Sequence, residues 1–259
     1  LAEITREVFE DLQINKYQYA EYRISIYGRD INEWDALSDW IIDNKLVSPN
    51  VRWMIQIPRL YGVYKRTKQI HSFQTMLTNI FLPLFHVTLH PEQNPKLHQL
   101  LCLIVGFDTV DDESVRTSVF DKANSPPQQW TRAEDPHYCT FLYYLYANLR
   151  VLNHLRELVG LNTFALRPHG GEAGDIEHMA SAFLLAQGVN HGLTLFKCPP
   201  LQYLFYLSQT GLSMSPLSNN LLFLEYSRNP FPRYFARGLN VALSTDDPLL
   251  IHVTKEPLV

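Results

Sequence analysis

Histidine and carboxylate residues in the second half of the sequence have the types and spacing that metal-dependent hydrolysis requires. His169 and Glu172 flank a pair of glycines in "RPHGGEAGD", His191 lies in "VNHGLTL", and Asp246 and Asp247 are adjacent in "STDDP". Imidazole nitrogen and carboxylate oxygen are ordinary ligands of a zinc ion that keeps one position open for water. A histidine and an aspartate at the ends of separate strands can therefore share one metal ion.

A metal ion alone does not complete such a reaction, because the attacking water must lose a proton and the leaving group must gain one. The glycine turn between His169 and Glu172 would hold this carboxyl group near the metal without making it a ligand. His191 and Asp247 are then available for the remaining proton transfer and orientation.

Each feature also has an ordinary structural explanation. A histidine and a glutamate at one strand end are commonly surface or structural residues, and a buried histidine such as His191 is commonly satisfied by a backbone carbonyl. "STDDP" is also consistent with a helix cap, in which Ser244 or Asp246 precedes Pro248 in the first helical turn. The coincidence of these features at separate strand ends favours a metal-dependent hydrolase.

The elements that would position these residues alternate between short apolar runs and longer amphipathic stretches. The apolar runs predict strands at residues 20–28, 51–59, 100–110, 163–167, 189–195, 211–220 and 239–248. Helical spacing predicts helices at residues 30–46, 73–90, 138–158, 176–187, 200–210 and 230–238. The polar, proline-bearing segment 111–136 is predicted to be a loop or insertion.

This order gives about seven β–α alternations without a run of hairpins. Such alternation favours a parallel sheet, and the length of 259 residues favours a barrel over an open sheet. The sequence therefore predicts an α/β fold of the (β/α)8 TIM-barrel type. In that fold the reactive residues lie at the carboxyl ends of the strands.

The composition is that of a globular protein and excludes several classes. Hydrophobic residues make up 46% and charged residues 19%, and the formal net charge is −4. No long basic stripe suggests a nucleic-acid partner, and no apolar run approaches the roughly 18 residues of a membrane span. Three cysteines without a Cys-x-x-Cys pair argue against a disulfide framework and fit a reducing compartment, the cytoplasm.

Several segments resemble the eukaryotic AMP deaminase family, and the similarity extends over essentially all 259 residues. It is carried by "RPHGGEAGDIEH", "VNHGLTL", "MSPLSNNLLFLEYSRNPFPRYFARGLNVALSTDDP" and "HVTKEPLV", and by the earlier "VRWMIQIPRLYGVYK". "SIYGR", "GFDTVDDES" and "MSPLSNN" are similar to the long pattern of the nucleotide enzyme rather than to adenosine deaminase.

The resemblance implies hydrolytic deamination of AMP to IMP and ammonia, a step of purine nucleotide interconversion, on a zinc-bearing barrel. It implies that His169 and Asp246 are ligands of Zn2+ and that His191 is the proton acceptor that activates the attacking water. Glu172 would contact the purine and carry a proton to its ring nitrogen. The substrate site would be lined by Glu172, Asp247, Pro248, Leu249 and Leu250.

The family carries a His-x-His pair of zinc ligands on its first strand, and none of the ten histidines here forms such a pair. The family would place that pair before Leu1. We therefore expect residues 1–259 to be one catalytic barrel domain that lacks its first strand and is incomplete at both ends. The resemblance also implies that the full-length protein is a homo-oligomer.

Two alternatives remain open. The absent His-x-His pair is compatible with a non-catalytic or truncated deaminase-like protein that binds nucleotide or serves as a subunit of a hetero-oligomer. A deaminase of adenosine or adenine would share the same barrel and metal motif, so turnover of AMP against adenosine separates it from the leading interpretation.

Overall fold

The computed structural model describes residues 1–115 and 125–248. Its elements are helices and parallel strands in two compact units. The first unit contains Leu1–Asp111 and Thr117–Leu166, and the second contains Asp112–Arg116 and Arg167–Val259. Among the described residues, no helix is long and apolar enough to cross a membrane.

The first unit is built on a four-stranded parallel sheet with the order β1-β2-β3-β4. Its strands are β1 (Ala20–Ser25), β2 (Val51–Pro58), β3 (Ile104–Val110) and β4 (Ala165–Leu166). Its helices are α1 (Ala2–Ile14), α2 (Glu33–Asp43), α3 (Tyr61–Arg66), α4 (Phe73–Leu89), η1 (Pro91–Gln93), α5 (Pro95–Leu103) and α6 (Tyr138–Leu158).

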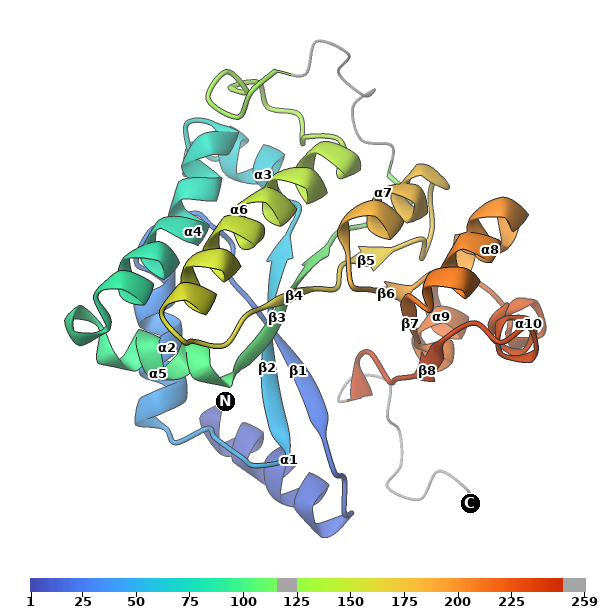
Figure 1. Cartoon of the computed structure of the whole chain (residues 1–259), viewed down its shortest axis with the longest axis horizontal. Helices are drawn as coiled ribbons and strands as arrows, with labels where there is room; N and C mark the ends of the chain where they lie inside the picture. The colour runs from blue at the N-terminus through green and yellow to red at the C-terminus, as the bar shows by residue number, and fades with distance from the viewer. Residues whose placement is uncertain (116–124, 249–259) are drawn as a thin grey trace. The chain divides into compact units, whose positions relative to one another are not determined.

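Helices α2, α4, α5 and α6 gather on one side of this sheet (Figure 1). Trp34 of α2 and Phe107 of β3 are fully buried there, with ring centroids 6.3 Å apart. The Trp34 indole donates a hydrogen bond of 2.8 Å to the carbonyl of Ile80, so its one polar atom is satisfied inside the core. Apolar burial between the sheet and its helices therefore holds the unit together.

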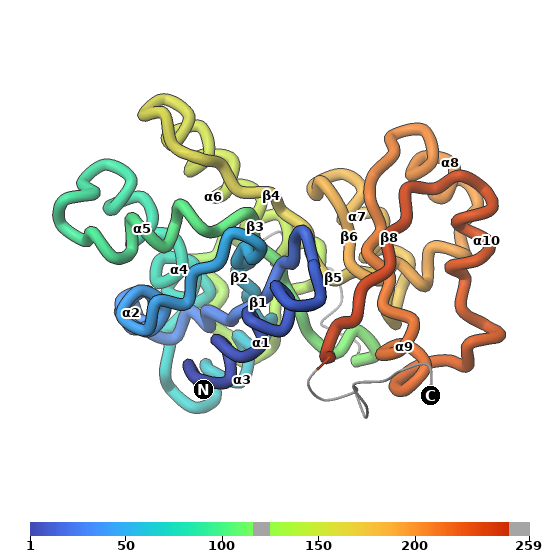
Figure 2. The backbone as a smooth tube through the Cα atoms, turned by 90° about the horizontal axis from the view of Figure 1, so that it is seen from below, coloured from blue at the N-terminus to red at the C-terminus, as the bar shows by residue number. Residues whose placement is uncertain are grey.

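The second unit has its own four-stranded parallel sheet, in the order β5-β6-β7-β8. Its strands are β5 (His169–Gly170), β6 (Gly188–His191), β7 (Gly211–Met214) and β8 (Val241–Leu243). Its helices are α7 (Glu177–Leu185), η2 (Leu193–Lys197), α8 (Pro199–Ser208), α9 (Pro216–Leu222), η3 (Tyr226–Arg228) and α10 (Phe231–Ala236). Helices α8 and α10 lie on one side of the β6–β7 strands, which the second view also shows (Figure 2).

The predicted α/β fold with parallel strands is confirmed; β4 lies within the predicted strand 163–167, whereas β5 lies just beyond it. All described pairings are parallel, and neither sheet closes on itself. The chain thus has an α/β fold with parallel strands, without a closed ring among the described residues. Whether residues 1–259 act as one catalytic domain stays a prediction.

Several predicted strands were too long; residues 100–103, for example, belong to helix α5, and two further corrections concern the site. The segment 211–220 is a strand only to Met214, because Pro216 begins helix α9 with the fixed φ that favours a first helical position. The segment 189–195 ends as a strand at His191, because Gly192 adopts a left-handed φ of 67° and a 3-10 helix follows. Both corrections place chemically active residues on turns and a helix rather than within strands.

Candidate active site

The carboxyl ends of the second sheet bring three predicted residues together. His169 lies on β5, His191 ends β6, and Asp246 follows β8. One ligand atom from each of these three residues lies within 4.8 Å of the other two. Parallel strands produce this convergence, because their carboxyl ends open on the same edge of a sheet.

The separations within this group suit a common ligand. The ring centroids of His169 and His191 are 4.9 Å apart, and His191 Nε2 lies 3.9 Å from Asp246 Oδ2. Both histidines are buried, whereas Asp246 keeps partial exposure. His169 and Asp246 offer an imidazole and a carboxylate, two ligand types of a catalytic zinc ion, and His191 lies next to both, so these residues fit such a metal.

Two of the three residues hold uncommon backbone conformations. His191 has a φ of 70° and Asp246 a φ of 31°, in the left-handed region that favours glycine. The hydroxyl of Tyr234 on α10 is 3.2 Å from the carbonyl oxygens of Gly192 and Leu193 and donates toward them, which fixes the chain after His191. Strained conformations of this kind cluster at functional sites.

Glu172 stands beside this group, beyond the glycine turn. Its Oε1 lies 3.5 Å from Nδ1 of His191 and accepts a 3.2 Å hydrogen bond from Nδ2 of Asn219. Burial raises the pKa of Glu172 to about 7, and the negative charges of Asp246 and Glu113 raise it as well. His169 and the Asn219 bond act in the opposite direction. Near neutral pH this carboxyl group can therefore both hold and release a proton.

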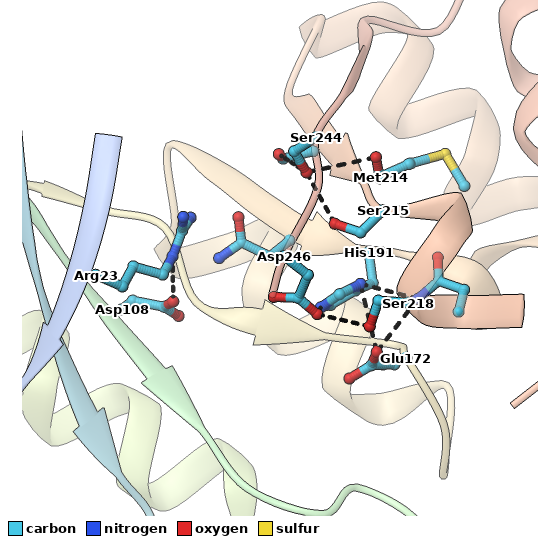
Figure 3. A network of polar contacts seen from close by, with 12 residues as sticks. Arg23, Asp108, Glu172, His191, Met214, Ser215, Ser218, Ser244 and Asp246 are labelled. Carbon is cyan, nitrogen blue, oxygen red and sulfur yellow. Dashed lines mark hydrogen bonds and ion pairs between the residues drawn. The ribbon is translucent and has the colours of Figure 1, made fainter. Parts of the chain in front are cut away.

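Two polar residues of helix α9, both within the run "MSPLSNN", complete the network. Ser218 donates a 2.9 Å hydrogen bond to Asp246 Oδ2, and Asn219 Nδ2 lies 3.1 Å from His191 Nδ1. Figure 3 shows Glu172, His191, Ser218 and Asp246 turned toward one another. The polar run "MSPLSNN" was the signal, but its prediction as a strand obscured which side chains share a face.

Of the remaining predicted substrate residues, the structure describes Asp247 and Pro248. Asp247 is largely exposed. The part of its side chain that is shielded from solvent raises its pKa, and the negative charge of Asp246 raises it further. Pro248 is half-buried, and Leu249 and Leu250 lie outside the described residues. The alternative helix cap at "STDDP" depends on the same residues beyond Pro248 and is not tested.

Glu113 in "VDDES" is a buried residue near the site that sequence reasoning did not identify. Its carboxylate accepts a hydrogen bond of 2.8 Å from the backbone N–H of Gly171, next to Glu172. No local spacing links Glu113 to the glycine turn, so only the folded chain reveals the contact.

Comparison with known families gives a match over the whole chain. The family model described as AMP deaminase matches residues 1–259. The probable AMP deaminase of Oryza sativa subsp. japonica is 59% identical over 259 residues, which are 100% of this chain and 32% of that protein. The AMP deaminase of Saccharomyces cerevisiae is 56% identical and AMP deaminase 3 of Homo sapiens 51%, each over the whole chain and over 32% and 34% of those proteins. The chain thus spans about a third of the length of these relatives.

Solved structures share the fold at low sequence identity. The adenine deaminase of Arthrobacter aurescens is 16% identical, with a TM-score of 0.56 over 97% of this chain and 63% of that chain. An amidohydrolase of Burkholderia ambifaria with bound Zn is 16% identical, with a TM-score of 0.56 over 98% of this chain and 59% of that chain. The protein of the ADAL–IMP complex is 14% identical, with a TM-score of 0.56 over 98% of this chain and 63% of that chain. These likenesses show the fold alone, an α/β fold of the TIM-barrel class.

Proposed function

The chain belongs to the AMP deaminase family, and we propose that the protein containing it hydrolyses AMP to IMP and ammonia. The observation that carries this proposal is the convergence of His169, His191 and Asp246 within 4.8 Å, with a partly protonated Glu172 beside them. A metal centre with an adjacent proton carrier is what hydrolytic removal of an amino group from a purine requires.

The proposed metal is zinc, and His169 and Asp246 are its proposed ligands. When bound, zinc supplies Lewis acidity that makes a water molecule nucleophilic near neutral pH. The Ser218 hydroxyl, by donating to Asp246 Oδ2, orients this carboxylate toward the shared position. His191 is the proposed proton acceptor, because its Nε2 lies 3.9 Å from Oδ2 of Asp246, beside the proposed metal position.

Glu172 is the proposed proton donor to the purine. Attack at the amino-bearing carbon places negative charge in the ring, and a neutral carboxylic acid removes that charge by protonating a ring nitrogen. A pKa of about 7 keeps a large fraction of Glu172 protonated at neutral pH. As ammonia leaves, His191 can pass the proton taken from water to the departing amino group, and the Glu172 carboxylate can take the proton of the new hydroxyl group on the ring carbon.

The Asn219 amide links the protonation states of Glu172 and His191. Nδ2 of Asn219 lies 3.2 Å from Glu172 Oε1 and 3.1 Å from His191 Nδ1. In this orientation the amide donates to both atoms, which suits an ionised Glu172 and a His191 whose Nδ1 carries no proton. A half-turn of the amide puts Oδ1 in that place. Oδ1 then accepts hydrogen bonds from protonated Glu172 and from Nδ1–H of His191. With its proton on Nδ1, a neutral His191 has an unprotonated Nε2 that can accept a proton.

Asp247 and Pro248, with Leu249 and Leu250, remain the proposed lining of the substrate site. The proposed compartment is the cytoplasm, supported by free thiols at Cys102, Cys139 and Cys198. Assembly into a homo-oligomer is proposed from the family resemblance.

The test uses the full-length protein that contains this chain. Ammonia release is measured with AMP, adenosine and adenine as separate substrates, and bound zinc is measured on the same sample. We expect turnover of AMP to exceed that of the other two, with loss of both zinc and turnover in His169→Asn and Asp246→Asn. Preferred turnover of adenosine or adenine would assign the site to those substrates. A folded protein that binds AMP without releasing ammonia would establish the non-catalytic alternative.

A further inference from the structure

We propose that Glu113 is a positioning residue for Glu172, acting through the backbone of the glycine turn; this inference rests on the proposed function of Glu172. Glu113 does not need to touch the substrate for this role. Its carboxylate holds the Gly170–Gly171 peptide group, one peptide group before the one that joins Gly171 to Glu172.

The contacts of Glu113 are short and buried. The side chain is 1% exposed, and Oε2 accepts a 2.8 Å hydrogen bond from the N–H of Gly171. The same oxygen lies 2.7 Å from Nδ1 of His178 on α7, whose side chain is 9% exposed. Because a carboxylate accepts both bonds, Nδ1 of His178 carries the proton.

The turn that Glu113 holds is fixed from its other side as well. The carbonyl of Gly171 accepts a 2.7 Å bond from the N–H of Thr194, and that of Gly170 accepts a 2.9 Å bond from the N–H of Gly192. Both polar groups of Gly171 are therefore bound, one by Glu113 and one by the segment after His191. The turn and the His191 segment form one hydrogen-bonded unit.

Steric contacts leave the turn little freedom. Gly171 has a φ of +69°, and a Cβ there would lie 2.5 Å from Met179 Sδ and 2.7 Å from Thr194 Oγ1. Gly174 also has a positive φ, and a Cβ there would overlap the carbonyl oxygen of Glu113. Glu113 thus contacts the turn at two glycines, with its carboxylate at Gly171 and its backbone at Gly174.

The consequence falls on the direction of the Glu172 side chain. Glu172 Oε1 reaches Asn219 and His191 at 3.2 and 3.5 Å from this one backbone conformation. A displacement of the Gly171 peptide would move the Glu172 carboxyl group relative to both, and displacements near 1 Å can cost about 100-fold in rate. Glu113 therefore fixes where the proton carrier stands.

Two substitutions separate the effect of the length of the Glu113 side chain from the effect of its charge. Glu113→Gln keeps the length of the side chain and an oxygen that accepts from Gly171, but removes the charge. Glu113→Asp keeps the charge and draws the carboxylate back from Gly171. In the full-length protein we expect Glu113→Asp to lower kcat for AMP about 10- to 100-fold with little change in KM, and Glu113→Gln to stay within about threefold of wild type. Zinc content should be unchanged in both.

Asp175→Asn is the matched control, because this exposed carboxylate follows the same turn. It should leave kcat and KM unchanged. The reverse order, with Glu113→Asp active and Glu113→Gln impaired, would show that the charge rather than the reach matters and would overturn the proposal. A rise in KM at constant kcat would overturn it too.

A double-variant cycle shows whether Glu113 acts through Glu172. In a Glu172→Gln background, Glu113→Asp should lower the residual kcat by less than about threefold, because residues that act as a unit are not additive. The full single-variant loss in that background would contradict the proposal.

Amide hydrogen exchange at Gly171 provides a readout that does not need turnover. Exchange should be faster than wild type in Glu113→Asp and unchanged in Glu113→Gln. If the wild-type protein does not deaminate AMP, the proposed function is wrong. If amide exchange at Gly171 is the same in Glu113→Asp as in wild type, the positioning role of Glu113 is wrong.

Discussion

His191 Nε2 and Asp246 Oδ2 approach to 3.9 Å from the ends of different strand regions, with the ring of His169 beside His191. Neither residue could reach the other from the middle of its strand. The approach arises because β6 ends at His191 and the chain turns at Asp246 just beyond β8. The predictions below depend on this convergence and on the polar residues that support it.

The bond from Ser218 to Asp246 is expected to tune metal affinity. Ser218→Ala removes the 2.9 Å hydrogen bond to Oδ2 and leaves the carboxylate free to rotate. Loss of a partner that orients a ligand costs about 10- to 100-fold in metal affinity. Zinc titration of the full-length protein against a competing chelator measures the change. Ser227→Ala, an exposed hydroxyl in η3, is the control, and equal affinities in the two variants would contradict the prediction.

Asn219 is expected to matter for turnover more than for folding. Asn219→Ala removes the shared contact to Glu172 and His191 at 3.2 and 3.1 Å. We expect kcat for AMP to fall about 10- to 100-fold, because both proton carriers lose their orientation. Steady-state kinetics checks this against Asn220→Ala, the exposed neighbour on the same helix. Equal kcat values for the two variants would exclude the role of Asn219.

Glu172 should make the metal-free protein less stable at high pH. Its pKa in the folded state is about 7, above the value of 4.5 for an unperturbed glutamate, so the folded state binds the proton more tightly than the unfolded state. The stability that this proton provides is fully present below pH 4.5 and is lost as the pH rises through about 7. Glu172→Gln removes the dependence, because glutamine does not ionise.

The expected difference between Glu172→Gln and wild type is therefore absent below pH 4.5 and favours the variant above pH 7. It reaches at most roughly 3 kcal/mol in the free energy of unfolding. Urea unfolding of chelator-treated protein at several pH values measures it. A constant difference across that range would show that Glu172 does not titrate as described.

Gly171 and Gly160 form a matched pair for the cost of a side chain. Both have a left-handed φ, of 69° and 74°, but a Cβ at Gly160 meets nothing within 4 Å, whereas one at Gly171 would press on Met179 and Thr194. Gly160→Ala should destabilise the fold by about 1 kcal/mol from backbone strain alone. Gly171→Ala should cost about 1–3 kcal/mol more, because overpacking is added to the strain. Thermal unfolding compares the two, and equal losses would indicate that Met179 and Thr194 yield without cost.

The sequence predicted much of the fold, because periodicity is a local signal. The amphipathic run in residues 30–46 became α2, and the apolar runs at 20–28 and 51–59 became β1 and β2. Strand-end placement also predicted that His169 and Asp246 would meet, which the structure bears out as a matter of geometry. Their roles as ligands stay a prediction.

Other parts of the site depend on contacts that no local pattern encodes. Residues 211–220 have the apolar content of a strand, yet Pro216 starts a helix, and only that helix presents Ser218 and Asn219 to the site. Glu113 reaches Gly171 across a large separation in sequence. Such partners depend on tertiary packing and become visible only when the second unit is folded.

The left-handed backbone at His191 and Asp246 has a consequence for how this chain can change. Each conformation costs about 1–3 kcal/mol in a residue that has a Cβ, so glycine at either position would relieve strain while deleting a ring or a carboxylate that the site uses. Selection for a more stable protein therefore favours glycine at these two positions, whereas selection for catalytic activity favours histidine and aspartate.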